Sequence, residues 1–143
     1  MTVRRQDRGK RAEKMVHNYL QSLSERVAEF DYERLPDARS AMGRFKSMVG
    51  DFAWFYPGRH GVIEVKETQH DYRLAKDKLP QLARLKKRVL AGGTCLILVY
   101  HSTANVWRCL DAAKLPLIER GSWDLREMPT FSKVSDIEIV KDK

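Results

Sequence analysis

Residues 94–100 read Thr-Cys-Leu-Ile-Leu-Val-Tyr, an almost uninterrupted apolar run, and no other segment constrains the fold as strongly. Successive side chains of a β-strand point to opposite faces of its sheet, so a strand without polar positions must be covered on both faces. Gly92 and Gly93 come directly before the run and are typical of the end of a preceding helix. The run therefore predicts a central strand between two layers, as in an α/β protein.

The other hydrophobic patterns supply neighbours for this strand. Apolar residues recur every three or four positions between residues 10 and 29, which predicts an amphipathic helix. Residues 51–56 are aromatic and residues 61–66 are β-branched, with turn residues between them, so a β-hairpin is expected. Further strands are expected at 30–34, 106–110 and 134–140, a helix at 77–91 with Asp77 as its N-cap, and a short helix at 111–119. The expected fold is a mixed central β-sheet flanked by helices.

The chain of 143 residues has the size of one domain, and 43% hydrophobic residues are enough to fill one core. We therefore expect a single domain over residues 1–143, with a basic N-terminal arm at 1–9, a protruding arm at 35–49 and a C-terminal extension at 120–143. The N-terminus is too charged for a signal peptide, and no apolar run approaches the roughly 20 residues of a spanning helix. A cytoplasmic location without membrane contact is expected, in which Cys95 and Cys109 stay buried and reduced.

The positive charge of the chain is concentrated in two segments. The net charge is +8; residues 1–14 contain six cations and two anions, and residues 73–88 contain seven cations and one anion. Such clusters bind nucleic acid because each cation placed on a phosphate releases condensed counterions, although a solvated helix face and a tail explain them as well. The cations expected to contact DNA here are Arg4, Arg5, Arg8, Lys10, Arg11, Arg73, Lys76, Lys78, Arg84, Lys86 and Lys87.

A candidate catalytic site lies in the expected hairpin. Gly50-Asp51 opens its first strand, and Glu64-Val65-Lys66 ends its second strand, with Glu64 thirteen residues after Asp51. Glu64 and Lys66 share one face of that strand, and pairing of the two strands brings Asp51 beside Glu64. Two carboxylates at a sheet edge suit Mg²⁺, with Mn²⁺ as a substitute, and the lysine can stabilise charge on a phosphate under attack. An ordinary surface pair of Glu64 and Lys66 is the alternative.

These residues resemble a known superfamily. The order of Gly50-Asp51, Ile63-Glu64-Val65-Lys66 and then Gln81 on the next helix is similar to the PD-(D/E)xK nucleases, whose core is restriction-endonuclease-like. The longer string at residues 63–69, followed by Gln81, Gly92-Gly93 and the central strand, resembles the RecU Holliday junction resolvases, in a compact form that fits a phage or prophage. The RecU pattern has threonines before the metal-binding aspartate, where this chain has Val49-Gly50, and an arm longer than residues 35–49.

The resemblance implies roles for two further residues. Arg8-Gly9-Lys10-Arg11-Ala12-Glu13 is similar to the first helix of resolvases in which a helix glutamate joins the metal site, although an exposed Glu13 among lysines fits nearly as well. Gln81 either orients a phosphate or caps its helix. The catalytic residues expected on these grounds are Glu13, Asp51, Glu64, Lys66 and Gln81, with Asp51 and Glu64 as the metal ligands.

Three functions are open at this stage. The first is a Mg²⁺-dependent endonuclease that resolves four-way DNA junctions; it would act as a homodimer, because resolution needs two symmetric nicks and one chain offers one site. Four residues of the arm then suit the junction centre, with cations for phosphates and a ring for an unpaired base: Arg39, Arg44, Phe45 and Lys46. The second function is cleavage of linear or damaged duplex by a nuclease of the same superfamily, and the third is DNA binding without catalysis.

Overall fold

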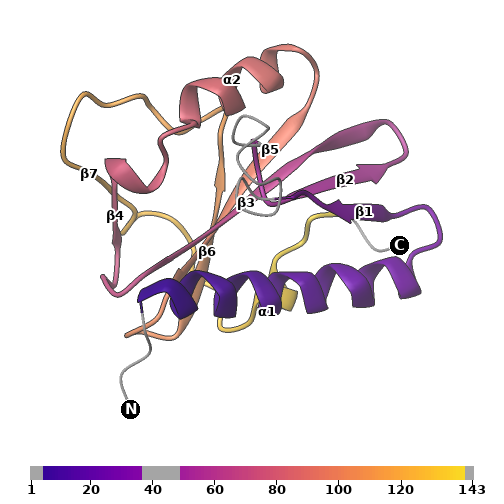
Figure 1. Cartoon of the computed structure of the whole chain (residues 1–143), viewed down its shortest axis with the longest axis horizontal. Coiled ribbons are helices and arrows are strands. Elements are labelled where there is room, and N and C mark those ends of the chain that lie inside the picture. The colour runs from indigo at the N-terminus through magenta and orange to yellow at the C-terminus, as the bar shows by residue number, and fades with distance from the viewer. Residues whose placement is uncertain (1–4, 37–48, 141–143) are drawn as a thin grey trace.

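The structure, a computed structural model, describes residues 5–36 and 49–140 (Figure 1). Residues 37–48, which make up most of the predicted arm, lie outside the described residues. The predicted order of helix, three strands, helix and two strands is confirmed for the main elements. In chain order the elements are α1 (Arg5–Arg26), β1 (Asp31–Arg34), β2 (Phe52–Tyr56), β3 (Arg59–Thr68), β4 (Arg73–Ala75), the 3-10 helix η1 (Lys76–Lys78), α2 (Leu82–Leu90), β5 (Thr94–His101), β6 (Val106–Asp111), β7 (Ser122–Asp124) and the 3-10 helix η2 (Val134–Asp136).

A five-stranded mixed sheet in the order β1-β2-β3-β5-β6 forms the centre of the molecule. β3 and β5 run parallel, and the other neighbouring strands are antiparallel. Parallel neighbours need a crossover, and here the chain crosses through β4, η1 and α2 before it returns as β5. The predicted central strand is β5, which has β3 on one side and β6 on the other.

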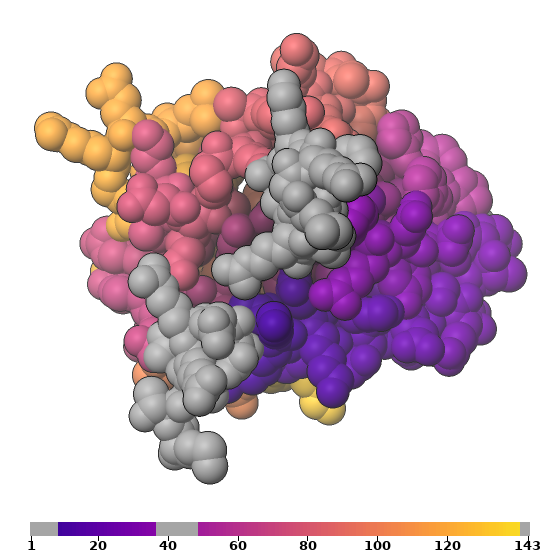
Figure 2. All heavy atoms as spheres, viewed as in Figure 1, coloured from indigo at the N-terminus to yellow at the C-terminus, as the bar shows by residue number. Residues whose placement is uncertain are grey.

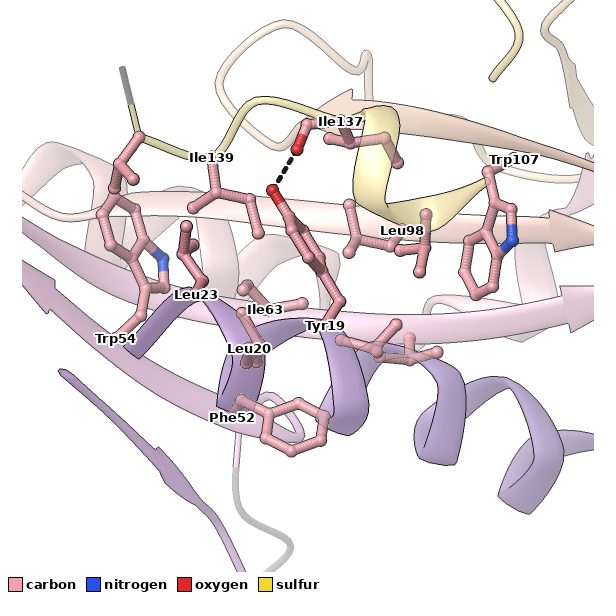
Figure 3. Packing of buried hydrophobic residues seen from close by; sticks show 14 of the residues in the cluster. Tyr19, Leu20, Leu23, Phe52, Trp54, Ile63, Leu98, Trp107, Ile137 and Ile139 are labelled. Atoms are coloured by element: carbon pink, nitrogen blue, oxygen red, sulfur yellow. Dashed lines mark hydrogen bonds between the residues drawn. The ribbon is translucent and has the colours of Figure 1, made fainter. Parts of the chain in front are cut away.

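One face of the sheet packs against α1, which lies across it in Figure 1. In the close view of this core, Trp54 and Trp107 lie at opposite ends of the cluster, and the Tyr19 hydroxyl donates a hydrogen bond to the Ile137 carbonyl (Figure 3). The C-terminal segment is therefore tied to α1 as well as to the sheet. The three- and four-residue steps of the sequence correspond to the buried helix residues, which are Ala12, Val16, Tyr19, Leu20, Leu23 and Val27.

The opposite face packs against α2 and the two-stranded antiparallel sheet of β4 and β7. Leu82 and Leu85 of α2 are buried there together with Trp123 of β7 and Ile97 of β5. A central strand covered on both faces, as the apolar run of β5 predicts, is thus present. The β4–β7 sheet is not foreseen by the sequence, because each of its strands has only three residues.

The parallel pair of β3 and β5 depends on a glycine. Gly61 pairs with Thr94, and a Cβ atom at Gly61 would lie only 1.6 Å from the Thr94 carbonyl oxygen. No side chain fits into that space. The two backbones can approach this closely only because Gly61 has no side chain. Gly61 and Thr94 are the first pair of the β3–β5 register. Farther along the same register, Glu64 lies opposite Ile97 and Lys66 lies opposite Val99.

Three local predictions are wrong, each where tertiary contacts decide the structure. α2 begins at Leu82, because residues 76–78 form η1, and the N-cap position belongs to Gln81 and not to Asp77. Residues 112–119 form turns and irregular chain, although Leu115 is buried in the second core. Residues 134–140 form η2 and irregular chain instead of an edge strand, and Ile137 is buried against α1.

Two expectations concern membrane-spanning helices and the cysteine thiols. Within residues 5–36 and 49–140, neither α1 nor α2 is long and apolar enough to cross a membrane. Cys95 is buried, Cys109 is half-buried, and both carry free thiols. Burial raises the pKa of the Cys109 thiol to about 11 and raises that of Cys95 as well, so neither is a ready nucleophile at neutral pH.

Candidate active site

The register of the β2–β3 hairpin decides how the candidate carboxylates lie. Phe52 pairs with Ile63, so Asp51, directly before β2, lies opposite Glu64. The Asp51 N–H donates to the Ile63 carbonyl at 2.8 Å, and Asp51 Oδ2 accepts a hydrogen bond from the Val65 N–H at 2.7 Å. The Asp51 side chain is thereby fixed beside β3 at the point where β2 begins.

Gly50 makes this close approach possible. Its φ of 92° lies in the left-handed region, and a Cβ atom there would lie 2.8 Å from the Cβ of Val62. The Gly50 N–H also donates a hydrogen bond to the Glu64 carboxylate. A threonine, which the RecU pattern has near this position, would therefore strain the backbone of this chain.

The carboxyl groups of Asp51 and Glu64 are neighbours, and both are partly buried. Burial and a hydrogen bond with Glu13 raise the pKa of Asp51 from 3.8 to about 7. Burial and the charge of Asp51 raise the pKa of Glu64, and the cation of Lys66 offsets part of that rise. Raised carboxyl pKa values in such a cluster are typical of functional sites, and a cation bound between the groups relieves their repulsion.

Glu13 reaches this pair from α1. It follows the buried Ala12 on the helix, and its side chain hydrogen-bonds with the Asp51 carboxyl group. Glu13 Oε2 also lies 3.8 Å from Nη2 of Arg34 at the end of β1. The structure thus brings Glu13 to the site and does not leave it among the exposed lysines of α1.

Lys66 lies on the same side of β3 as Glu64. Its Nζ atom is 3.1 Å from Glu64 Oε1, and a quarter of its side chain is exposed. The ammonium group is therefore next to the carboxylates and also open to a ligand from solution. Four of the five expected catalytic residues, namely Glu13, Asp51, Glu64 and Lys66, are close together in the structure.

Gln81 is the fifth expected residue, and the structure shows no hydrogen bond between it and the other four. It occupies the N-cap position of α2, but its side chain makes no capping hydrogen bond, so the capping alternative is wrong. Its amide oxygen is buried and has no hydrogen-bond partner within the described part of the chain. A buried acceptor of this kind calls for a ligand or water, and the phosphate role stays a prediction.

The cations predicted to contact DNA lie on both basic segments. In Figure 2, atoms of the coloured part of α1, which begins after residue 8, and atoms of the chain from β4 to α2 are visible on the same face of the molecule. The exposed members are Lys10, Arg11, Arg73, Arg84 and Lys87, and the half-buried ones are Lys76, Lys78 and Lys86. For Arg5 and Arg8 only the helical backbone is described, while Arg4, Arg39, Arg44, Phe45 and Lys46 lie outside the described residues.

Some of these cations are held by the protein itself. Arg11 Nη2 donates to Glu67 Oε2 at 2.6 Å, and the Glu67 side chain is almost completely buried. Lys76 donates to the Glu119 carbonyl at 2.6 Å, and Lys86 donates to the Ala112 carbonyl at 2.9 Å. These partners are not visible in the sequence, because two of the three are main-chain oxygens, which every residue has.

The donors at the site fit a Mg²⁺ ion. Within the described residues, no three His, Cys, Asp or Glu side chains lie close enough together to hold an ion. Mg²⁺ commonly takes only one or two protein carboxylates and completes its shell with water and phosphate oxygens. Asp51 and Glu64 are two such carboxylates, and they face each other at the start of β2.

Comparisons with known proteins show a likeness of the fold to a solved structure. No family model matches the sequence, and no curated protein matches it. Among solved structures, the chain is similar to Hjc, a Holliday junction resolvase from the archaeal hyperthermophile Archaeoglobus fulgidus, with a TM-score of 0.56 and 18% sequence identity. The likeness covers 90% of this chain and 98% of Hjc. The fold is therefore the mixed α/β, restriction-endonuclease-like fold of Hjc, as the sequence predicts.

Proposed function

We propose that the protein is a Mg²⁺-dependent endonuclease that resolves four-way DNA junctions as a homodimer, in the manner of the RecU-like resolvases that its sequence resembles. The observation that carries the proposal is the juxtaposition of Asp51 and Glu64, two carboxyl groups with raised pKa values beside the ammonium group of Lys66. The likeness of the fold to Hjc, which is a Holliday junction resolvase, supports the choice of substrate.

Each residue of the site would have a separate role in phosphodiester hydrolysis. Bound Mg²⁺ would supply a Lewis acid for the phosphate and an activated water. Asp51 and Glu64 would hold the ion, and Glu13 orients Asp51 through their hydrogen bond. Lys66, whose ammonium group lies beside Glu64, would stabilise the negative charge that develops on the phosphate oxygens. Gln81 would orient a neighbouring phosphate through its amide group.

The basic segments and the arm would recognise the substrate. Cations on α1 and along residues 73–88 bind phosphates of any duplex, so they give affinity without selectivity. Residues Arg39, Arg44, Phe45 and Lys46 would contact the open centre of a junction, where phosphates converge and bases are unstacked. Two copies of the chain related by a two-fold axis would place one site on each of two opposing strands.

The test compares one junction with its own arms. A fluorescently labelled four-way junction and the linear duplexes of the same arm sequences are incubated with the protein in Mg²⁺ or in EDTA. We expect paired symmetric nicks in the junction, intact linear duplexes, and no cleavage in EDTA. Equal cleavage of junction and duplex identifies a different nuclease of this fold, and binding without cleavage in Mg²⁺ or Mn²⁺ identifies a non-catalytic DNA-binding protein.

Two conservative variants make the test specific for the site. Asp51→Asn removes the charge of a proposed metal ligand with little change in size, so we expect cleavage to fall by orders of magnitude while junction binding is kept. Asp31→Asn makes the same change at an exposed position of β1 and is expected to cut like the wild type. Wild-type cleavage by Asp51→Asn in saturating Mg²⁺ would contradict the assignment of this ligand.

A further inference from the structure

A buried pair of basic side chains lies outside the site described above. His101 ends β5 with 0% of its surface exposed, and Arg108 on β6 is 6% exposed. Arg108 Nη1 lies 3.1 Å from His101 Nε2 and 2.8 Å from the Asp71 carbonyl oxygen, and Arg108 Nε lies 3.4 Å from the Met128 carbonyl oxygen. Buried guanidinium groups usually face a carboxylate, but among the described residues Arg108 has no ion pair.

The hydrogen bonds fix the protonation state of His101. A guanidinium group can only donate, so His101 Nε2 accepts from Arg108 and the ring proton is on Nδ1. Nδ1 therefore donates to the His70 carbonyl oxygen, at a distance of 2.6 Å. Burial lowers the pKa of His101, in agreement with a neutral ring. His101 and Arg108 thus donate hydrogen bonds to the carbonyl oxygens of His70 and Asp71. These two carbonyl groups belong to one turn.

The turn at residues 70–73 is stabilised by further hydrogen bonds that do not involve His101 or Arg108. His70 Nδ1 accepts hydrogen bonds from the backbone N–H groups of Tyr72 at 3.2 Å and Arg73 at 3.0 Å. The Tyr72 carbonyl accepts from the Leu125 N–H at 2.7 Å, which joins the turn to the segment after β7. The carbonyl groups of residues 70–72 and the amide groups of Tyr72 and Arg73 therefore have defined partners, although the side chains of His70 and Arg73 are exposed.

This turn joins the two parts of the molecule that DNA cleavage would use. Before it lies β3, which carries Glu64 and Lys66, and after it lies β4, where the basic segment 73–88 begins. Figure 1 shows β4 leaving the end of β3 at this turn and leading to α2. A change in the turn would thus move the basic segment relative to the catalytic strand.

We propose that Arg108 and His101 are positioning residues for DNA binding, which fix the 70–73 turn from inside the protein and so set where the basic segment lies relative to Glu64 and Lys66. The proposal rests on the proposed function in one respect, since it requires that residues 73–88 bind DNA. Neither side chain needs to touch DNA, because both are buried. A pair that only stabilises the fold would leave the DNA affinity of the folded protein unchanged.

The main variant is Arg108→Lys, which keeps the charge but cannot reproduce the forked contacts to His101, Asp71 and Met128. Its control is Arg120→Lys, the same substitution at an exposed position before β7. Dissociation constants for a labelled four-way junction are measured in EDTA at several salt concentrations, well below the unfolding temperature, and Mn²⁺ affinity is measured separately. Hydrogen exchange at the amides of Tyr72 and Arg73 reports the turn without DNA.

For Arg108→Lys we expect faster exchange at both amides, a junction affinity about tenfold weaker, and a shallower salt dependence, because phosphate contacts are lost. Mn²⁺ affinity should stay at the wild-type value, and Arg120→Lys should match the wild type throughout. Faster exchange with unchanged junction affinity would overturn the proposal. Failure of the wild type to bind the junction would instead contradict the proposed function, and the exchange data would still report the turn.

A second pair of variants serves if Arg108→Lys does not fold. His101→Gln keeps an amide oxygen within reach of Arg108, whereas the shorter side chain of His101→Asn reaches only the Nδ1 side toward His70. We expect His101→Gln to bind the junction more tightly than His101→Asn, with slower exchange at Arg73. Equal junction affinities combined with unequal exchange rates would also overturn the proposal.

Discussion

Asp51→Asn is expected to stabilise the metal-free protein, although it abolishes the proposed activity. Asp51 has a pKa of 3.8 in an unfolded chain and about 7 in the folded protein, chiefly because of burial and its hydrogen bond with Glu13. The folded state therefore holds the proton more tightly, and the free energy of unfolding falls as the pH rises from about 4 to about 7. At pH 8 the ionised group costs the folded state up to about 4 kcal/mol.

The asparagine side chain resembles the protonated form of Asp51. Its amide oxygen can accept the hydrogen bond from the Val65 N–H, and its amide nitrogen can donate toward Glu13. In EDTA at pH 8 we expect Asp51→Asn to exceed the wild type by about 2–4 kcal/mol, or by roughly 6–12 °C in Tm. Near pH 4.5 the difference should shrink to about 1 kcal/mol, because the wild-type group is then protonated in the folded state.

Thermal unfolding at the two pH values, with and without Mg²⁺, checks this reasoning. Added Mg²⁺ should raise the Tm of the wild type and leave that of Asp51→Asn unchanged, because the variant lacks one of two carboxylate ligands. Asp31→Asn, at an exposed site, should stay within about 0.5 kcal/mol of the wild type. Equal stability of Asp51→Asn and the wild type at pH 8, or a difference at pH 4.5 as large as that at pH 8, would refute the electrostatic argument.

Four further predictions concern cleavage and binding. Glu64→Gln should lose cleavage by orders of magnitude and keep junction binding. Lys66→Ala should cleave more slowly but keep its Mn²⁺ affinity. Loss of Mn²⁺ binding in Lys66→Ala would show that the lysine has a structural role. Neutralising the exposed Arg84 and Lys87 should weaken binding to junction and linear DNA alike and lower the salt slope by about one per lost phosphate contact; a loss confined to the junction would contradict this. Replacing residues 37–46 by a short glycine linker should leave a folded, Mn²⁺-binding protein that no longer prefers junction over duplex, and an unchanged preference in a competition assay would exclude the arm as the recognition element.

The central sheet could be predicted because its strands are specified by the residues that they bury. The apolar run at residues 94–100 became β5, and the paired segments at 51–56 and 61–66 became β2 and β3 with nearly the predicted bounds. α1 could be predicted from one apolar stripe, which packs on the sheet. In these elements local propensity and tertiary burial favour the same structure.

The predictions failed where local signals compete with packing. Asp77 and Pro80 look like the first turn of a helix, yet the chain forms η1 there because β4 pairs with β7 just before it. Ile137 and Ile139 alternate with a polar residue as in a strand, but they pack beside α1, where the Ile137 carbonyl accepts the hydrogen bond of Tyr19. Short sequences of this kind are decided by contacts from distant parts of the chain.

The candidate site also has features that could be predicted from the sequence and features that could not. The spacing between Asp51 and Glu64 was enough to predict that they meet, because a hairpin allows few registers. The reach of Glu13 depends on how α1 crosses the sheet, and the need for Gly50 depends on a 2.8 Å approach to Val62; neither is visible in a residue pattern. The partners of His101 and Arg108 are carbonyl groups, which every residue has.

The site lies at this edge because β3 is longer than its neighbour β2. β2 begins at Phe52, opposite Ile63, so β3 continues past it with β5 on one side and no strand of the described chain on the other. A strand edge of this kind leaves N–H groups without partners, which proteins must satisfy in another way. Here the Asp51 carboxylate accepts the hydrogen bond of the Val65 N–H and so takes the position that a strand carbonyl would have. The edge thereby gains an acidic group next to Glu64, in a place where a third strand carbonyl would otherwise stand.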